Sequence, residues 1–206
     1  MADTQTSRKP SGFDPWVLAS DPVFYIAAIL VVAGLIWLAM SGQQETRGFS
    51  FDGRHLVIEE ESLAGLVPGP GTVSEYAPAE LSARMTAEAP FSQAGTLSAG
   101  VGLLLPRAFE EAVIGHEVEV TVELRSLSPE DHQAYVSYFT AGSGDSPRHL
   151  IELDGDWQLY TFTFAVPPTA IANEEEWVGI WPDLDGIERP LLVRRIEARI
   201  LDTAAN

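Results

Sequence analysis

The chain has 206 residues, no cysteine and a formal net charge of −18. The lack of cysteine excludes disulfides, thiolate metal sites and cysteine nucleophiles. Residues 1–42 carry three acidic and two basic side chains, so −17 of the net charge belongs to residues 43–206. An acidic segment of this kind repels nucleic acid and anionic headgroups, which leaves two interpretations, a well-solvated surface or a surface for a cationic partner.

The longest apolar run, VFYIAAILVVAGLIWLAM, spans residues 23–40 and contains no charged side chain. A helix of this length rises about 27 Å at roughly 1.5 Å per residue, which is enough to cross a bilayer core. Tyr25 near one end and Trp37 near the other suit the two membrane interfaces. The sequence therefore predicts one transmembrane helix, and a signal peptide cleaved near residues 39–41 is the alternative.

The basic residues around this run set its orientation. Arg8 and Lys9 precede the run, and Arg47 is the nearest cation after it. The positive-inside bias then places the N-terminus in the cytoplasm and the following domain in the periplasm, with the helix in a bacterial inner membrane. The expected organisation is a cytoplasmic or interfacial segment at 1–22, a transmembrane helix at 23–40, a polar linker at 41–50 and a periplasmic domain at 51–203.

Two Asp-Pro pairs, at 14–15 and 21–22, each predict a helix start. Aspartate caps free N–H groups, and proline at the first helical position loses no hydrogen bond. The first pair would begin a short helix at the membrane surface, and the second would begin the spanning helix. We expect Phe13, Trp16 and Leu18 to contact the interface or a partner protein.

The predicted membrane helix carries small residues at intervals of seven, Ala27, Gly34 and Ser41, which lie along one stripe. Such a stripe lets a partner helix pack closely, although small residues are also common in membrane helices generally. The Phe-Asp-Pro opening before a span resembles the entry of light-harvesting α-polypeptides. Those polypeptides hold bacteriochlorophyll through a histidine in the span. Residues 23–40 contain none, so the resemblance implies a position beside such a complex without pigment.

From residue 51 onward, short alternating runs are separated by Gly, Pro, Asp and Ser. In 118–124 (VEVTVEL) and 158–166 (QLYTFTFAV), every second residue is apolar, which is typical of strands with one buried face. Further strands are predicted at 55–60, 82–87, 97–105, 134–140, 148–153, 176–182 and 191–200, with a short helix or turn at 106–114. Nine short strands with turn signals between them predict a mostly β fold, an antiparallel β-sandwich.

The order of these strands resembles that of carbohydrate-binding-module jelly rolls of the galactose-binding-like type, over about residues 95–201. The resemblance is carried by GHEVEVTVELRS, YVSYFTAG, IELDGDWQLYTFTFAVP, VGIWPD and LLVRRIEARI. It implies a packing role for Trp157 and, as in many such jelly rolls, a structural calcium ion. The acidic runs 59–61 and 174–176 would lend oxygens to calcium, and the alternative is that both runs are solvated surface. We expect no other cofactor or metal.

Sugar recognition needs exposed aromatic faces beside polar groups. In 177–181 the period of two places Trp177 and Trp181 on one face of a strand. We consider a sugar-stacking pocket that draws on these two tryptophans together with Tyr135 and His132. The alternative is that the aromatic side chains are buried, because large aromatics are on average highly buried.

Catalytic chemistry is not expected. Gly142-Ser143-Gly144 lacks the strand-to-helix context of a nucleophile elbow, and the four histidines of the chain show no metal-ligand spacing. Two functions remain. The favoured one is an accessory subunit of a larger photosynthetic or respiratory membrane complex, with other membrane subunits and the lipid bilayer as partners. The alternative is a membrane-tethered carbohydrate-binding module that recognises envelope glycan.

Overall fold

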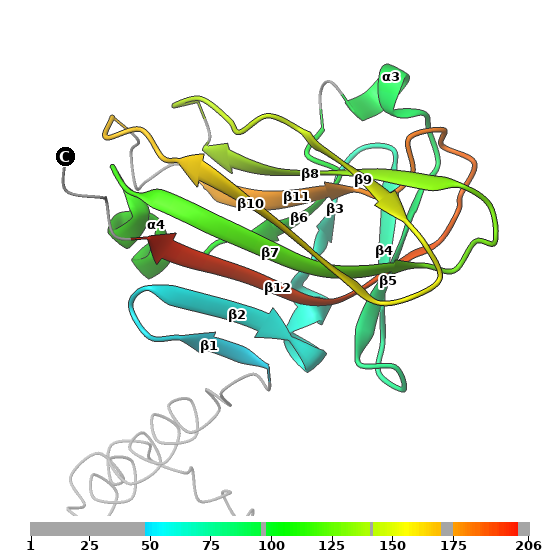
Figure 1. The fold of residues 1–206 in the computed structure, drawn as a ribbon, viewed down its shortest axis with the longest axis horizontal. Coiled ribbons are helices and arrows are strands. Elements are labelled where there is room, and N and C mark those ends of the chain that lie inside the picture. Colours follow the sequence, from blue (N-terminus) through cyan, green and yellow to red (C-terminus); the bar gives the residue numbers. More distant parts are fainter. Residues whose placement is uncertain (1–47, 96–97, 141, 170–174, 202–206) are drawn as a thin grey trace, which may run out of the picture. The chain divides into compact units, whose positions relative to one another are not determined.

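A computed structural model describes residues 48–95, 98–140, 142–169 and 175–201 (Figure 1). Among the helices in these ranges, none is both long and apolar enough to cross a bilayer. The predictions that concern residues 1–47 lie outside the described residues: the membrane span, the interfacial residues Phe13, Trp16 and Leu18, and the small-residue stripe of Ala27, Gly34 and Ser41.

The described strands form two antiparallel sheets, and the predicted β-sandwich is confirmed. The seven-stranded sheet contains β1 (Phe49–Phe51), β2 (His55–Glu59), β4 (Thr72–Ala77), β5 (Ser82–Ala87), β7 (Glu117–Ser126), β10 (Gln158–Ala165) and β12 (Leu191–Leu201). The five-stranded sheet contains β3 (Val67–Pro68), β6 (Val101–Leu104), β8 (His132–Thr140), β9 (His149–Leu153) and β11 (Glu176–Trp181). Short helical segments are η1 (Glu60–Gly65), α3 (Phe91–Ala94) and α4 (Arg107–Val113).

Each of the nine predicted strands corresponds to an observed strand, and α4 occupies the segment predicted as a short helix or turn. Three strands, β1, β3 and β4, were not predicted. β3 has two residues, and in β4 the apolar Val73 is exposed while Thr72 is buried, so its side chains do not alternate in the expected way. β1 begins at Phe49, within the last residues of the segment predicted as a linker.

β12 organises the seven-stranded sheet. On one side it pairs with β7 along its whole length. On the other side it pairs first with β5, through Leu191–Val193, and then with β2, through Arg195–Arg199. An irregularity between Val193 and Arg195 marks the change of partner. Figure 1 shows β12 in red between β7 and the β1–β2 hairpin.

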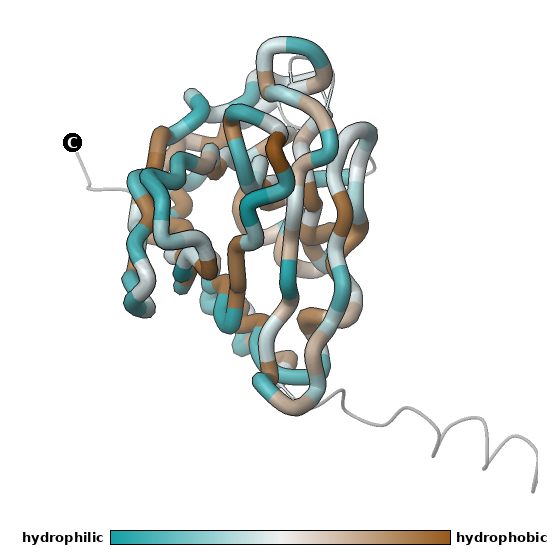
Figure 2. The backbone as a smooth tube through the Cα atoms, turned by 90° about the vertical axis from the view of Figure 1, so that its right-hand side faces the viewer, coloured by the Kyte–Doolittle hydropathy of each residue, from teal (hydrophilic) through white to brown (hydrophobic). Residues whose placement is uncertain are grey.

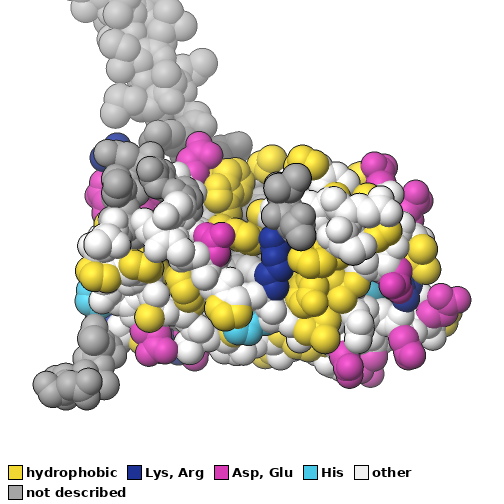
Figure 3. Space-filling view, turned by 90° about the horizontal axis from the view of Figure 1, so that it is seen from above, with side chains coloured by type: hydrophobic (Ala, Val, Ile, Leu, Met, Phe, Trp, Pro, Cys, Tyr) yellow, Lys and Arg dark blue, Asp and Glu magenta, His cyan; other side chains and the backbone are white. Residues whose placement is uncertain are grey.

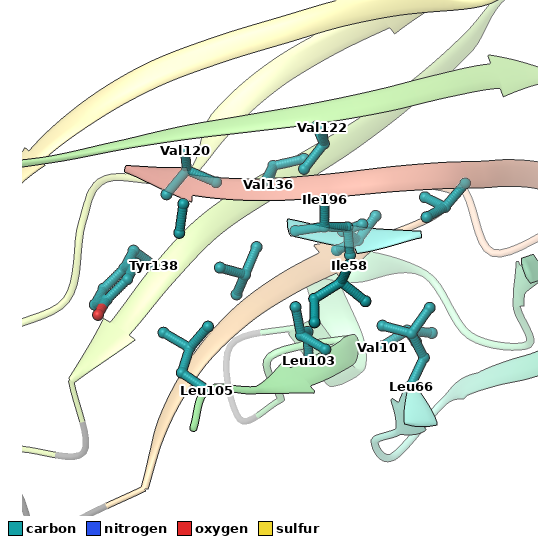
Figure 4. Packing of buried hydrophobic residues seen from close by; sticks show 14 of the residues in the cluster. Ile58, Leu66, Val101, Leu103, Leu105, Val120, Val122, Val136, Tyr138 and Ile196 are labelled. Carbon is teal, nitrogen blue, oxygen red and sulfur yellow. The ribbon is translucent and has the colours of Figure 1, made fainter. Parts of the chain in front are cut away.

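The core lies between the two sheets, where hydrophobic and hydrophilic residues alternate along the strands (Figure 2). On β7, Val118, Val120, Val122 and Leu124 are fully buried, and the residues between them face outward. Val120 and Val122 belong to the same core cluster as Val136 and Tyr138, which come from the opposite sheet (Figure 4). Full burial of each such side chain stabilises the fold by about 1.5–3 kcal/mol, so the two interleaved faces hold the sheets together.

The loop after β11 is organised by a buried carboxylate. Asp183 is fully buried and accepts hydrogen bonds from the backbone N–H groups of Asp185, Ile187 and Arg189. The Arg189 guanidinium also donates to Asp183 Oδ1 through Nη2 at 2.7 Å and through Nε at 3.1 Å. Burial alone would raise the pKa of Asp183, but these hydrogen bonds outweigh it and hold the pKa below its usual range.

Two more carboxyl groups are buried near one end of the five-stranded sheet. The Tyr138 hydroxyl donates to Glu176 Oε2, and the backbone N–H of Glu176 donates to Glu110 Oε1 at 2.9 Å. Burial raises the pKa of both Glu110 and Glu176, and the carboxyl group of Glu110 adds to the rise at Glu176. A carboxyl group whose pKa is higher in the folded state stabilises the fold at a pH below its pKa in the unfolded chain, which is near 4.5. This stabilisation is lost as the pH rises through the pKa of the folded state.

We therefore expect Glu176→Gln to gain stability relative to the wild type as the pH rises from about 5 to about 8. The amide oxygen still accepts from Tyr138, and the buried group no longer ionises. Urea unfolding at the two pH values measures the effect. Glu130→Gln, in an exposed loop, is the matched control and should keep a constant difference from the wild type. A constant difference for Glu176→Gln as well would contradict the prediction.

Candidate functional site

The outer face of the five-stranded sheet, which points away from the core, carries aromatic rows on either side of a row of small residues. In register across β6, β11 and β8, the rows are Leu104–Trp177–Phe139, then Gly102–Gly179–Ser137, then Trp181 beside Tyr135. The period of two in β11 puts Trp177, Gly179 and Trp181 on this face and turns Val178 and Ile180 into the core. The small row is itself covered, because Ala99 and the Phe139 ring lie directly over Gly179.

Trp177 is the half-buried aromatic residue of β11 and lies against Gly102 of β6. A Cβ atom at position 102 would lie 2.8 Å from Trp177 Cε3, so only glycine lets the indole ring lie flat on the strand. The ring lines a shallow groove of about 230 Å³, together with Val67, Pro68, Pro70 and Ala99. Trp177 therefore offers an indole surface to a ligand that enters the groove.

Trp181 is buried, as the alternative interpretation of the sequence expected for these aromatic residues. It is fully buried, and its Nε1 donates to the Asp183 carbonyl oxygen at 3.0 Å. Phe91 of α3 packs edge-on against Trp181 and against Tyr135, with ring centroids 5.6 Å and 4.7 Å away. The expected pair of outward tryptophans is thus reduced to Trp177, while Trp181 and the half-buried Tyr135 serve packing under α3.

His132 is not among the residues that line the Trp177 groove. It is buried, and its Nε2 lies 2.6 Å from the Pro182 carbonyl oxygen, so Nε2 is the donor. Its Nδ1, 2.7 Å from Ser126 Oγ, then accepts from that hydroxyl. Burial lowers the pKa of His132, which agrees with a neutral ring. Both Ser126 and His132 are buried, and their hydrogen bonds link β8 to the end of β7 and to the loop after β11.

Arg148, in the loop between β8 and β9, was not predicted as a site residue, and no local pattern marks it. Its Nη2 donates to the carbonyl oxygens of Gly95 and Ser98, at 2.7 Å and 3.3 Å. The guanidinium also lies over the rings of Phe91 and Phe139, 5.0 Å and 5.3 Å from their centroids. Seen from the side that carries α3, hydrophobic side chains flank a basic one (Figure 3).

A second, polar pocket has a volume of about 460 Å³ and is lined by Asp131, His132, Gln133, Glu152, Leu153, Asp154 and Gln158. It adjoins the start of β8, whereas Phe139, beside Trp177, lies near the end of that strand. Six residues of strand separate the two ends by about 20 Å, so the polar pocket and the Trp177 groove are separate features.

Within the described residues, which do not include Glu174, no three His, Asp or Glu side chains converge. Glu176 is bonded to Tyr138, and the carboxylate of Glu59 lies 3.7 Å from Arg195 Nε. Trp157, for which the resemblance implied packing, is half-buried between the guanidinium groups of Arg125 and Arg194, 5.0 Å and 4.5 Å from its ring centroid. It therefore packs through cation–π contacts.

No family model and no curated sequence matches the chain. Among solved structures, the chain is similar to a tandem of family 22 carbohydrate-binding modules of Xyn10C from Paenibacillus barcinonensis, with 13% identity over 69% of this chain and 43% of that one and a TM-score of 0.49. It is also similar to the C-terminal family 22 module of Clostridium thermocellum Xyn10B, with 12% identity over 77% and 97% of the two chains and a TM-score of 0.48. A family 29 module from Piromyces equi shows 13% identity over 70% and 89%, with a TM-score of 0.41.

Proposed function

We propose that the β-sandwich is a non-catalytic, jelly-roll-type carbohydrate-binding domain that holds neutral glycan through the groove at Trp177. The observation that carries the proposal is the half-buried indole of Trp177, held flat on Gly102 and lining an open groove. The C–H faces of a sugar ring stack on such a surface, and the prolines of the groove extend the apolar contact.

Polar groups beside the groove would bind the sugar hydroxyls. Several backbone groups of the groove are already paired within the protein, such as the Gly69 N–H with the Gly100 carbonyl oxygen and the Gly100 N–H with Ser98 Oγ, so a side chain is the better candidate. Arg148 contacts Phe139, the cross-strand neighbour of Trp177, and its hydrogen bonds to the described backbone use only Nη2. Its other N–H groups therefore remain for hydroxyl oxygens.

The charge of the chain favours a neutral ligand. Residues 43–206 carry a net charge of −17, which would repel an anionic polysaccharide. The apolar run at 23–40 extends the proposal: as a membrane anchor, it would hold the domain at the periplasmic face of a bacterial inner membrane, close to envelope glycan. The accessory-subunit function has no observation in its favour among the described residues.

Replacing Trp177 with alanine is expected to weaken glycan binding at least about tenfold, or about 1.4 kcal/mol, because the stacking surface is lost. Isothermal titration of the full chain with neutral oligosaccharides of xylose, glucose and N-acetylglucosamine measures the effect. Trp157→Ala, which removes a half-buried tryptophan on another face, is the matched control and should bind as the wild type does. A wild-type chain that binds none of these sugars, or equal losses in the two variants, would contradict the proposal.

A further inference from the structure

β10 is an edge strand without the usual protection against pairing. Within the described residues it pairs only with β7, over eight consecutive positions and without a register shift. Its sequence, QLYTFTFA, contains no charge, proline or glycine. Natural edge strands usually carry a charge, a proline or a bulge, because their free N–H and C=O groups otherwise recruit another strand. The free edge of β10 therefore has the chemistry to accept an extended polypeptide.

The side chains of β10 are only partly covered, although the Phe162 ring stacks on His149 of β9 and the Tyr160 hydroxyl donates to the Glu152 carbonyl oxygen. Tyr160, Phe162 and Phe164 belong to the core face of the strand but are only half-buried, whereas the core-facing residues of the neighbouring β7 are fully buried. On the outward face, Leu159 remains 65% exposed. A strand added beside β10 would bury part of these four side chains, which is favourable at roughly 25 cal/mol per Å² of apolar surface.

We propose that β10 pairs with β10 of a second copy of this chain, antiparallel and about a two-fold axis at Phe162, in a continuous sheet across the dimer. This proposal is independent of the proposed glycan binding. The strand is self-complementary in this register: the axis pairs Phe162 with itself, Tyr160 with Phe164, Thr161 with Thr163, and Leu159 with Ala165. Aromatic pairs and threonine pairs directly opposite each other stabilise antiparallel strands.

Charge also favours a second copy at this edge. Two domains of the same strong negative charge repel each other, so they can meet closely only where the surface is neutral. β10 is such a neutral strip. On the neighbouring strand β7, the carboxylate of Glu119 lies 3.7 Å from Arg199 Nη1. The carboxylate of Glu123 forms an ion pair with Arg194. The strand itself therefore carries no charge into a symmetric interface, and the acidic residues Glu152 and Asp154 lie only beside its first residues.

The lack of native cysteine makes a direct test available. Full-length Thr161→Cys and Thr163→Cys chains, with different tags, are mixed in detergent and mildly oxidised. Because the register places these two positions opposite each other, we expect a disulfide between the differently tagged chains. The control pair is Glu119→Cys with Thr121→Cys, on the outward face of β7. The disulfide yield of the first pair should exceed that of the control pair at least about tenfold. Equal yields for the two pairs would overturn the proposal.

A second variant tests the interface without cysteine. Thr161→Lys with Thr163→Lys sets like charges directly opposite each other across the proposed axis, while both side chains point to solvent within each copy. We expect the dimer dissociation constant, measured by sedimentation, to rise by more than about tenfold with an unchanged circular dichroism spectrum. A wild-type chain that is monomeric, yet loses a co-purifying protein in this variant, would overturn self-pairing and assign the edge to another polypeptide.

Discussion

Trp181→Ala is expected to lower the free energy of unfolding by about 3–5 kcal/mol, the usual cost of removing a buried aromatic side chain. The indole fills the space beneath Phe91, and its Nε1 satisfies the Asp183 carbonyl oxygen. Truncation leaves a cavity and removes that hydrogen bond. Urea denaturation followed by far-ultraviolet circular dichroism measures the loss.

The matched control for this variant is Trp177→Ala, which removes the same side chain from the same face of the same strand. Because Trp177 is only half-buried, its removal should cost well under half as much stability as the removal of Trp181. The two variants separate the roles: Trp181 for stability and Trp177 for glycan binding. Similar stability losses in both would show that Trp177 is also a packing residue and would weaken the proposed function.

Arg189→Ala should also cost about 3–5 kcal/mol, because it leaves Asp183 buried without its counter-ion. The Asp183 side chain has no exposed surface, and that of Arg189 is 12% exposed. Arg107→Ala is the control, since the Arg107–Glu111 pair is 71% and 54% exposed and such surface pairs contribute at most about 1 kcal/mol. Chemical denaturation at neutral pH distinguishes the two variants.

The pH dependence of this effect has a defined direction. The pKa of Asp183 is lowered in the folded state, so its stabilisation is present above the unfolded value, 3.8, and is lost as the pH falls through the folded value. In Arg189→Ala, burial is no longer offset by the guanidinium, and this acid-side loss should shrink or disappear. A variant that retains the wild-type acid profile would show that the backbone N–H groups alone lower the pKa of Asp183.

The local pattern of the sequence was sufficient for most strands, because alternation along a strand reflects which face is buried. It failed for β4, whose edge position leaves Val73 exposed. It also failed to distinguish Trp177 from Trp181. Their spacing shows that they share a face, but the cover over Trp181 comes from Phe91, ninety residues earlier in the chain. Contacts of this kind depend on the tertiary fold and leave no trace in a local pattern.

The pattern gave less support for placing His132 beside Tyr135, because the two residues are three positions apart and the period of two puts them on opposite faces of β8. Arg148 and Phe91 lie outside the five-stranded sheet, in a loop and a short helix, and meet over its outer face. Gly102 was not singled out either, since its importance comes from a ring on the neighbouring strand. The sequence was sufficient to propose a candidate site on β11, but which of its aromatic residues is accessible required the structure.

The position of β12 has a consequence for the order in which the domain forms. β2 and β5 reach β7 through hydrogen bonds to β12, which is the latest of the described strands to be synthesised. Until β12 has left the ribosome, the strands that precede it have no common partner, and the edges of β2 and β7 that pair with β12 remain unpaired. Folding is therefore expected to be delayed until synthesis of the domain is complete, and chains truncated before Leu191 should need a chaperone to stay in solution.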